Sequence, residues 1–371
     1  MYKKAEIVID NMHFEEKFLS DTDAFSTESQ NVTALNVDSS KFNGLSLKNV
    51  EVNPPAINKG SKEQLCNGIP AVELPCKPNE PSDSDCCGSG CMPCVFDIYE
   101  QEVKIWEREC ARVRNATIIG NDGLSEENVL SELEYRRFVI SDIWEETADT
   151  NRYRFHLIIN KSLGLKIGQH IVIRGKANNE TVTRQYTPVS DIACTGYFDL
   201  VIKIYKDGKM SRIIKEWKVD DEVDIRGPFG SLNYFPGKFK VILMLAAGTG
   251  IAPMSQVIQE VLNNKEDETF IHLLYACHKY QDILMKRELD EWSDYWNFSV
   301  SYVLSQEKDG KYRYGDRIYK GRIDETYIQR EINNKPVNKW LVLICGTRSF
   351  NDDMIKYCTN LGFNQQQLFR F

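Results

Sequence analysis

Apolar residues are spread unevenly along this chain of 371 residues, and their spacing changes twice. Between about residues 20 and 62, Ser, Asn, Asp and Thr predominate with only isolated apolar residues. Such a stretch cannot bury enough surface to offset the entropy of ordering its backbone. We therefore predict that residues 1–62 are disordered and that most of the core forms from about Tyr135 onward.

Short apolar runs with turns between them follow Tyr135: RRFVISDIW, YRFHLIIN, QHIVIRG, YFDLVIKIY and DEVDIRG. Alternation with a period of two, broken by Gly, Asn and Asp, is typical of antiparallel strands. The spacing predicts an antiparallel β-barrel over residues 132–236.

The strands after FPGKFK are continuously apolar, as in VILMLA, FIHLLYAC, FSVSYVL and WLVLIC. They alternate with helical stretches such as PMSQVIQEVL and DILMKRELDEW. This order is typical of βαβ units on a parallel sheet. We therefore predict a multidomain protein whose barrel is followed by an α/β domain over residues 239–371.

Composition narrows the function classes. A formal net charge of -8 argues against general nucleic-acid binding. No run reaches the roughly 18 to 20 apolar residues that span a bilayer, so we expect no transmembrane segment. Eleven cysteines without a secretory signal indicate a reducing compartment, and acidic residues near the start disfavour a mitochondrial transit peptide. A cytoplasmic, monomeric protein is the resulting expectation, with mitochondrial association left open.

Residues 66–115 form a separate cysteine-rich module. In CCGSGCMPC, the thiols of Cys86, Cys87, Cys91 and Cys94 have the spacing C-C-x3-C-x2-C, and Cys76 lies upstream. Thiolates at this spacing can hold zinc or an iron–sulfur cluster. A reactive-thiol or docking segment is the alternative interpretation.

The stretch after these cysteines, VFDIYEQEVKIWERECARV, repeats apolar residues at helical spacing. Val95, Ile98, Tyr99, Val103 and Trp106 would share one side of a helix. We predict a short amphipathic helix there, and a linker at NDGLSEEN after it.

Three motifs in the two larger domains carry candidate chemistry. In RQYTPVS, the side chains of Arg184, Tyr186, Thr187 and Ser190 stand where a barrel strand enters a turn. A guanidinium, an aromatic plane and hydroxyls together suit a flat ring that bears phosphate. An ordinary exposed edge strand is the alternative.

In DGKMSRIIKEW, a turn at Gly208 precedes Lys209, Met210 and Ser211 at a helix start. Free N–H groups there, beside a lysine, form a natural cradle for pyrophosphate, although a simple capped helix has the same sequence.

In LMLAAGTGIAPM, an apolar strand leads into Gly248, Thr249 and Gly250, with Pro253 at the start of a helix. Glycines in that setting let the backbone approach a dinucleotide closely.

The order RxYTxxS, GKMS, GTGxxPM and a C-terminal strand ending in CG resembles the NADH-cytochrome b5 reductase branch of the ferredoxin-reductase superfamily, from about Tyr135 to Phe371. The resemblance implies a barrel that binds FAD and an α/β domain that binds NADH, rather than NADPH. It assigns the flavin ring and its phosphate arm to Arg184, Tyr186, Thr187 and Ser190, and the pyrophosphate to Lys209, Met210 and Ser211. Cofactor-lining residues implied in the same way are Gly208, Gly248, Gly250 and Pro253, together with Val201, Lys203 and Tyr205.

The resemblance also implies catalytic residues. Thr249 would touch both flavin and nicotinamide, and Cys345 with Gly346 would place a thiol near the site of hydride transfer. His170, in GQH, is either a proton relay or a buried structural histidine. Asp282 would face the adenosine ribose and oppose a 2′-phosphate.

The implied function is electron transfer from NADH through FAD to a one-electron acceptor such as cytochrome b5. An NADPH-dependent reductase of another redox protein and a non-catalytic flavin-binding scaffold are the alternatives. Two departures favour keeping them: Gln185 replaces the usual proline after the arginine, and the usual CGPPPM loop is CGTRSF. The phrase CCGSGCMPCVFDIYEQEVKIWE resembles the short oxidoreductase-like module found in related proteins.

Overall fold

The computed structural model describes residues 74–82, 95–116, 129–158, 160–177, 180–308, 310–333 and 336–371. Every element below belongs to one compact unit, Ile69–Phe371. Three predictions lie outside the described residues: the disorder of residues 1–62, the ligand set Cys86, Cys87, Cys91 and Cys94, and the linker at residues 121–128.

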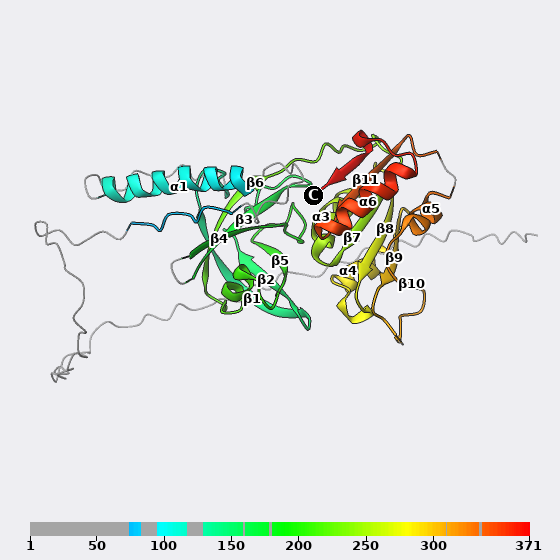
Figure 1. Ribbon diagram of the computed structural model, residues 1–371, viewed down its shortest axis with the longest axis horizontal. Coiled ribbons are helices and arrows are strands. Elements are labelled where there is room, and N and C mark those ends of the chain that lie inside the picture. The colour runs from blue at the N-terminus through cyan, green and yellow to red at the C-terminus, as the bar shows by residue number, and fades with distance from the viewer. Residues whose placement is uncertain are drawn as a thin grey trace, which may run out of the picture. The chain divides into compact units, whose positions relative to one another are not determined.

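Six antiparallel strands form the first lobe, which we call the barrel lobe (Figure 1). The strands are β1 (Arg136–Thr147), β2 (Thr150–His156), β3 (His170–Ala177), β4 (Glu180–Tyr186), β5 (Tyr197–Lys203) and β6 (Glu222–Phe229), in the order β4-β3-β6-β1-β2-β5. Inward side chains from all six strands meet in one buried cluster, in which Phe155 and Phe198 stack at 5.0 Å. The short helix α2 (Lys209–Ile214) adds Met210 and Ile214 to this cluster.

Strand β5 is buried on both faces. Phe198, Leu200 and Ile202 point into the barrel core, whereas Val201 packs in the core of the next lobe. Because neighbouring side chains of a strand face opposite ways, β5 is the wall that the two lobes share.

The second lobe, the α/β lobe, contains six parallel strands in the order β10-β9-β8-β7-β11-β12. They are β7 (Val241–Ala247), β8 (Phe270–Cys277), β9 (Phe298–Leu304), β10 (Arg317–Lys320), β11 (Trp340–Cys345) and β12 (Leu368–Arg370). The expected fold class, an antiparallel barrel followed by a parallel-sheet α/β domain, is confirmed. The edge strands β10 and β12 were not predicted, because four and three residues are too few to show a period.

Helices cover both faces of the parallel sheet. Met244 of β7 packs with α3 (Ile251–Asn263) and α4 (Lys286–Trp292), whereas Leu243 and Leu245 pack with α5 (Glu325–Ile332) and α6 (Arg348–Asn360). The continuous apolar run of β7 follows from this burial on two sides.

Helix α1 (Val95–Ala116) confirms the helix predicted after the cysteines. It is longer than its apolar pattern indicated, and its most buried residues include Ile105, Cys110 and the charged Glu102. Among the helices that the structure describes, none combines the length and apolar character needed to cross a membrane.

Candidate functional site

The candidate site lies where the carboxyl ends of β7 and β11 meet. These strands are parallel neighbours, and Ala246 lies opposite Cys345. The chain leaves β7 toward β8 on one side, whereas β11 lies on the other, so the strand order reverses here. Open α/β sheets bind ligands at this kind of switch point. The 3-10 turn η2 (Gly248–Gly250) follows β7 directly and occupies this position.

The two glycines of η2 are favoured at their positions for different physical reasons. A Cβ at Gly250 would lie 2.1 Å from the carbonyl oxygen of Cys345, so only glycine allows this contact. Gly248 has φ +53°, and a Cβ there would meet nothing within 4 Å. The Oη of Tyr275 donates to the Gly248 carbonyl at 2.9 Å. Thr249 is therefore held between a tight contact with β11 and an open side.

Helix α3 ties this turn to the barrel lobe. Gln256 accepts from the N–H of Gly168 at 3.0 Å and donates to the carbonyl of Pro188 at 3.3 Å. Gln259 donates to the carbonyl of Val189 at 3.0 Å. The Gly-Thr-Gly turn thus precedes α3 directly, and side chains of the same helix hydrogen-bond to the RQYTPVS segment. No motif predicted Gln256; the available signal was a glutamine within an otherwise apolar helix face, where its side chain is 1% exposed.

The RQYTPVS side chains lie on β4 and the turn after it. Arg184 is exposed, and its Nη1 donates to the carbonyl of Thr183 at 2.7 Å. Tyr186, two residues on and therefore on the same face, is half-buried against the barrel core, and burial raises its pKa. Thr187 is half-buried, and Ser190 accepts from the N–H of Asp199 at 3.1 Å.

The GKMS residues lie at the start of α2. Ser211 is buried, its Oγ accepts from the N–H of Tyr205 at 3.0 Å, and a Cβ at Gly208 would lie 2.8 Å from that Oγ. Met210 is buried in the barrel core. Because these side chains face inward, their backbone N–H groups, with Lys209, are what this turn can offer to a phosphate.

Three residues predicted to line the cofactor lie at the end of β5: Val201 and Lys203 belong to the strand, and Tyr205 follows it. Val201 packs in the core of the α/β lobe, and Lys203 forms an ion pair with Asp149 at 2.7 Å. Tyr205, beyond the end of the strand, is 56% exposed.

The C-terminal CG motif closes the site. Burial raises the pKa of the Cys345 thiol to about 12, so this sulfur stays protonated at neutral pH. A Cβ at Gly346 would lie 2.5 Å from the ring of Phe350 and 3.0 Å from Cβ of Ala247. Thr347 accepts from the N–H of Phe350 and caps α6. The residues that replace the usual proline-rich loop therefore start a helix.

Asp282 and Pro253 each belong to the first turn of a helical segment. The Asp282 carboxylate accepts from the N–H of Lys279 at 3.0 Å and caps the 3-10 turn η3 (Tyr280–Asp282). Pro253 is buried in the first turn of α3. The position of Asp282 relative to a ribose stays a prediction.

A second contact between the lobes was not predicted. Arg152 of β2 pairs with Glu146 of β1 at 3.0 Å and with Glu288 of α4 at 2.6 Å. Glu146 also accepts from the N–H of Met285 at 2.8 Å, where φ is +55° just before α4 begins. We call these four residues the interlobe latch. Alternating charged residues in a strand read as a solvent face, so the spacing gave no sign of this burial.

His170 lies at the start of β3, beside Phe229 and Gly230. Its Nε2 is buried without a hydrogen-bond partner among the described residues, and burial lowers its pKa from 6.5 to about 4. A neutral, poorly solvated ring fits a structural role better than proton transfer at neutral pH.

This lowered pKa predicts an acid-sensitive fold. As the pH falls below 6.5, His170 binds a proton in the unfolded chain, whereas in the folded chain it stays neutral until about pH 4. The folded state is therefore destabilised relative to the unfolded state between these two pH values. We expect the free energy of unfolding to fall by about 2 kcal/mol from this group between pH 7 and pH 5. Urea titrations at both pH values measure it. His170→Gln should remove this part of the drop, whereas His156→Gln, at an exposed histidine, should keep it.

The residues at the junction fit a flavin and a pyridine nucleotide. Tyr186 supplies an aromatic face, Arg184 an exposed guanidinium, and the open side of Gly248 leaves space at the strand ends. When bound, these cofactors supply the hydride and electron chemistry that side chains lack. Across the described residues, no three His, Cys, Asp or Glu side chains form a metal-binding group, and Cys76 is an exposed free thiol.

Comparison with known proteins defines the class. Residues 137–234 match the model of the oxidoreductase FAD-binding domain, and residues 244–356 match that of the oxidoreductase NAD-binding domain. Residues 68–115 match the N-terminal domain of oxidoreductase-like proteins. Fold and site together thus define an FAD-dependent NAD(P)H oxidoreductase.

Similar proteins then give the family. The NADH-cytochrome b5 reductase-like protein of Mus musculus is 36% identical over 304 residues, which are 80% of this chain and 95% of that protein. NADH-cytochrome b5 reductase 1 of Dictyostelium discoideum is 37% identical over 251 residues, 67% of this chain and 86% of that protein. The cytochrome b5 reductase domain of Ulva prolifera nitrate reductase is 29% identical with a TM-score of 0.60, and the match covers 66% of this chain and 100% of that one. The chain belongs to the NADH-cytochrome b5 reductase family.

The alignment with the mouse protein includes more than the barrel lobe and the α/β lobe. Residues from 137 onward make up less than two-thirds of the chain, so an alignment that covers 80% of it must include part of the preceding segment. The cysteine-rich module and α1 lie in that segment.

Proposed function

We propose that this protein transfers electrons from NADH, through FAD bound by the barrel lobe, to a one-electron acceptor protein of the cytochrome b5 kind. The observation that carries the proposal is the set of hydrogen bonds from α3 to the RQYTPVS segment. Gln256 and Gln259 hold that segment on the helix whose first residues follow Gly248–Gly250. The flavin motif and the nucleotide motif therefore share one rigid support, as transfer between stacked rings requires.

Individual residues then have specific work. Arg184 offers positive charge and Tyr186 an aromatic face toward the flavin, and the amides at the start of α2 favour its pyrophosphate. Thr249 orients the two rings against each other. Cys345, protonated and packed against Gly250, shapes the nicotinamide side without acting as a nucleophile, because a thiolate is the reactive form.

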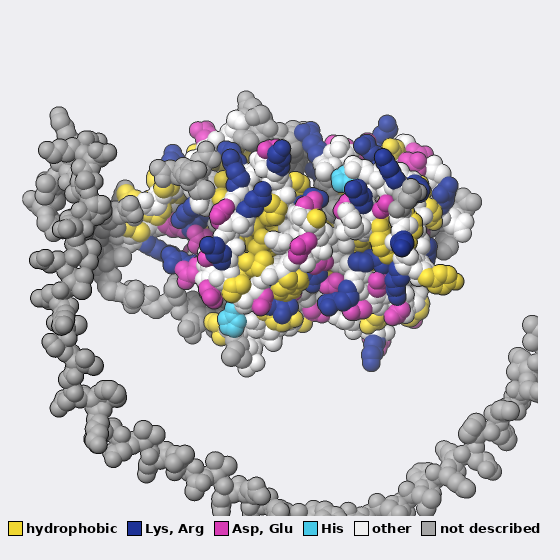
Figure 2. All heavy atoms as spheres, turned by 90° about the horizontal axis from the view of Figure 1, so that it is seen from below, with side chains coloured by type: hydrophobic (Ala, Val, Ile, Leu, Met, Phe, Trp, Pro, Cys, Tyr) yellow, Lys and Arg dark blue, Asp and Glu magenta, His cyan; other side chains and the backbone are white. Residues whose placement is uncertain are grey.

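The acceptor follows from the relatives, whose names include cytochrome b5. Surface charge alone does not identify it. Figure 2 shows a face on which Lys and Arg side chains are interspersed with Asp and Glu. Arg137, a basic candidate for contact with an acidic partner, is already paired with Glu222 at 3.0 Å.

Anaerobic stopped-flow reduction of the FAD-loaded protein tests the nucleotide. We expect NADH to bleach the flavin at least ~10-fold faster than NADPH at equal low concentration, because Asp282 repels a 2′-phosphate. Asp282→Ala should narrow this ratio, whereas Asp294→Ala, at an exposed aspartate of the same lobe, should leave it unchanged. Faster reduction by NADPH would favour an NADPH-dependent reductase. No bleaching by either would leave the scaffold interpretation.

The cysteine module stays a separate question. Zinc or an iron–sulfur cluster at Cys86, Cys87, Cys91 and Cys94 is a prediction that metal analysis of the purified chain would decide. A cytoplasmic, monomeric enzyme remains our expectation.

A further inference from the structure

One face of α1 is charged, and yet it is buried. Glu102 and Glu109 are seven residues, about two turns, apart and therefore lie on one side of the helix. Between and beside them, Ile105 is 2% and Cys110 is 4% exposed. An isolated helix would leave this face in water, so its burial indicates a partner surface built to receive carboxylates.

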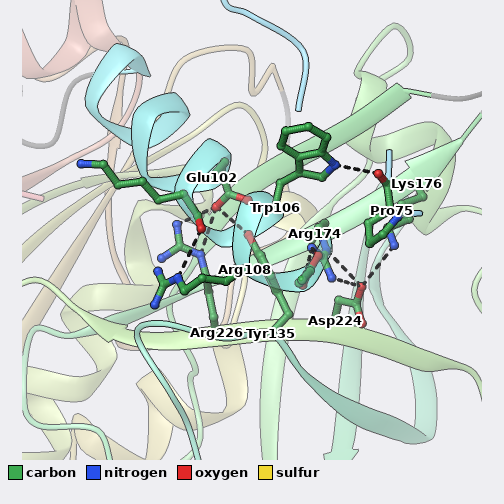
Figure 3. Close-up of polar contacts among 11 residues, drawn as sticks. Pro75, Glu102, Trp106, Arg108, Tyr135, Arg174, Lys176, Asp224 and Arg226 are labelled. Atoms are coloured by element: carbon green, nitrogen blue, oxygen red, sulfur yellow. Dashed lines mark hydrogen bonds and ion pairs between the residues drawn. The ribbon is translucent and has the colours of Figure 1, made fainter. Parts of the chain in front are cut away.

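The first half of that surface is Arg226 of β6, whose side chain is 2% exposed. Its Nε and Nη2 donate to Oε1 of Glu102 at 3.0 and 2.6 Å, and the Oη of Tyr135 donates to the same oxygen at 2.8 Å (Figure 3). Burial raises the pKa of Tyr135, so this hydroxyl remains a donor. Among the described residues, Glu102 is the one carboxylate within ion-pair distance of Arg226. The barrel therefore contains a buried cation whose counter-ion comes from α1.

The second half is Arg174 of β3. Its Nη1 donates to both carboxylate oxygens of Glu109 at 3.0 Å, while Nε and Nη2 hold Asp224 of β6 at 3.1 and 2.9 Å. The ring of Tyr135 lies 3.9 Å from the guanidinium of Arg174 and 5.4 Å from that of Arg226. Two arginines, flanking one aromatic ring, thus receive two glutamates of the same helix face.

A further segment, which includes Pro75, also contacts α1. The indole N–H of Trp106 donates to the carbonyl of Pro75 at 2.6 Å, so residues before the cysteine cluster contact the helix as well. Because Cys94 is joined directly to Val95, the cysteine segment is tethered to the barrel lobe through α1.

We propose that the β3–β6 face of the flavin-binding lobe is a docking surface for an acidic amphipathic helix, and that its permanent partner is α1 of this chain's own oxidoreductase-like module. Helix α1 is then an integral layer of the reductase and not a loosely linked appendage. The Arg226–Glu102 pair determines the position of the helix, because removing one partner of a buried pair leaves an uncompensated charge. The Arg174–Glu109 pair adds to binding, but Arg174 keeps Asp224 without it.

The test uses the full-length, FAD-loaded protein with a specific protease site placed within residues 121–128. After purification the chain is cut there, and the affinity of the N-terminal piece for the reductase piece is measured by titration of a labelled fragment. We expect the two pieces to stay together through gel filtration. Glu102→Gln should weaken their binding at least ~100-fold, and Glu109→Gln about 10-fold. Glu107→Gln, an exposed glutamate of the same helix, should leave binding unchanged.

Folding is checked before cleavage by circular dichroism and flavin content, so that loss of binding is not confused with unfolding. Glu102→Leu combined with Arg226→Met removes both buried charges and should restore binding to within about 10-fold of the parent protein. Separation of the wild-type pieces on gel filtration overturns the proposal. Equal binding by the Glu102→Gln and Glu107→Gln variants overturns it too.

Discussion

Gly250→Ala is expected to reduce kcat/KM for NADH by about 100-fold or more, the loss that follows when reacting groups are displaced by about 1 Å. The new methyl group would meet the Cys345 carbonyl oxygen at 2.1 Å. That oxygen belongs to β11, which is paired with β7 from Trp340 to Cys345, so it cannot move aside alone. The turn that carries Thr249 has to shift instead. Steady-state turnover and anaerobic flavin reduction measure the effect, and urea unfolding should show a cost of about 1–3 kcal/mol.

Gly237→Ala, in the loop before β7, is the matched control. Its methyl group would meet nothing within 4 Å, so the remaining cost is the left-handed backbone at φ +78°, about 1–2 kcal/mol. It should lower stability to a similar degree and keep most of the rate of flavin reduction. If both alanine variants lose the same rate, the contact with Cys345 does not position Thr249.

The lobes themselves were predictable from the sequence because burial on one face gives a period of two and burial on both faces gives a continuous apolar run. The first half of β1, where Phe138 and Ile140 are buried and Val139 is exposed, shows the first case, and β7 shows the second. The order of the motifs also indicated the family, since each motif follows a strand or begins a helix where a cofactor needs backbone groups.

The contacts that could not be predicted are polar and join segments that are distant in the sequence. Gln256, Arg152 and Glu102 are buried, and each has its partners in an element distant in sequence. A charged or amide side chain within a helix or strand reads as a solvent face, because pattern carries no information on what lies opposite. Glu102 shows this best: the apolar pattern placed Val103 and Trp106 on the buried side, whereas Glu102 beside them is buried more deeply than either.

Arg152→Met is expected to lower the free energy of unfolding by about 3–5 kcal/mol, the cost of breaking a buried ion pair. Arg152, Glu146 and Glu288 have side chains 9%, 13% and 16% exposed, so the two glutamates would be left close together with little water to screen them. Glu146 also holds the N–H of Met285 at the start of α4. Repulsion at this latch should separate the α/β lobe from the barrel and slow flavin reduction at saturating NADH. Chemical unfolding and single-turnover kinetics measure the two effects.

Arg137→Met provides the comparison, because Arg137 pairs with Glu222 on the surface, where the two side chains are 72% and 55% exposed. Water and salt screen such a pair, so its loss should cost no more than about 1 kcal/mol and leave the rate unchanged. Adding Glu146→Gln and Glu288→Gln to Arg152→Met removes the like charges and should recover part of the stability. Recovery of stability without recovery of rate would mean that the ion pairs of Arg152 position α4, beyond the effect of removing like-charge repulsion. Equal stability of the Arg152→Met and Arg137→Met variants would show that the latch is no stronger than a surface contact.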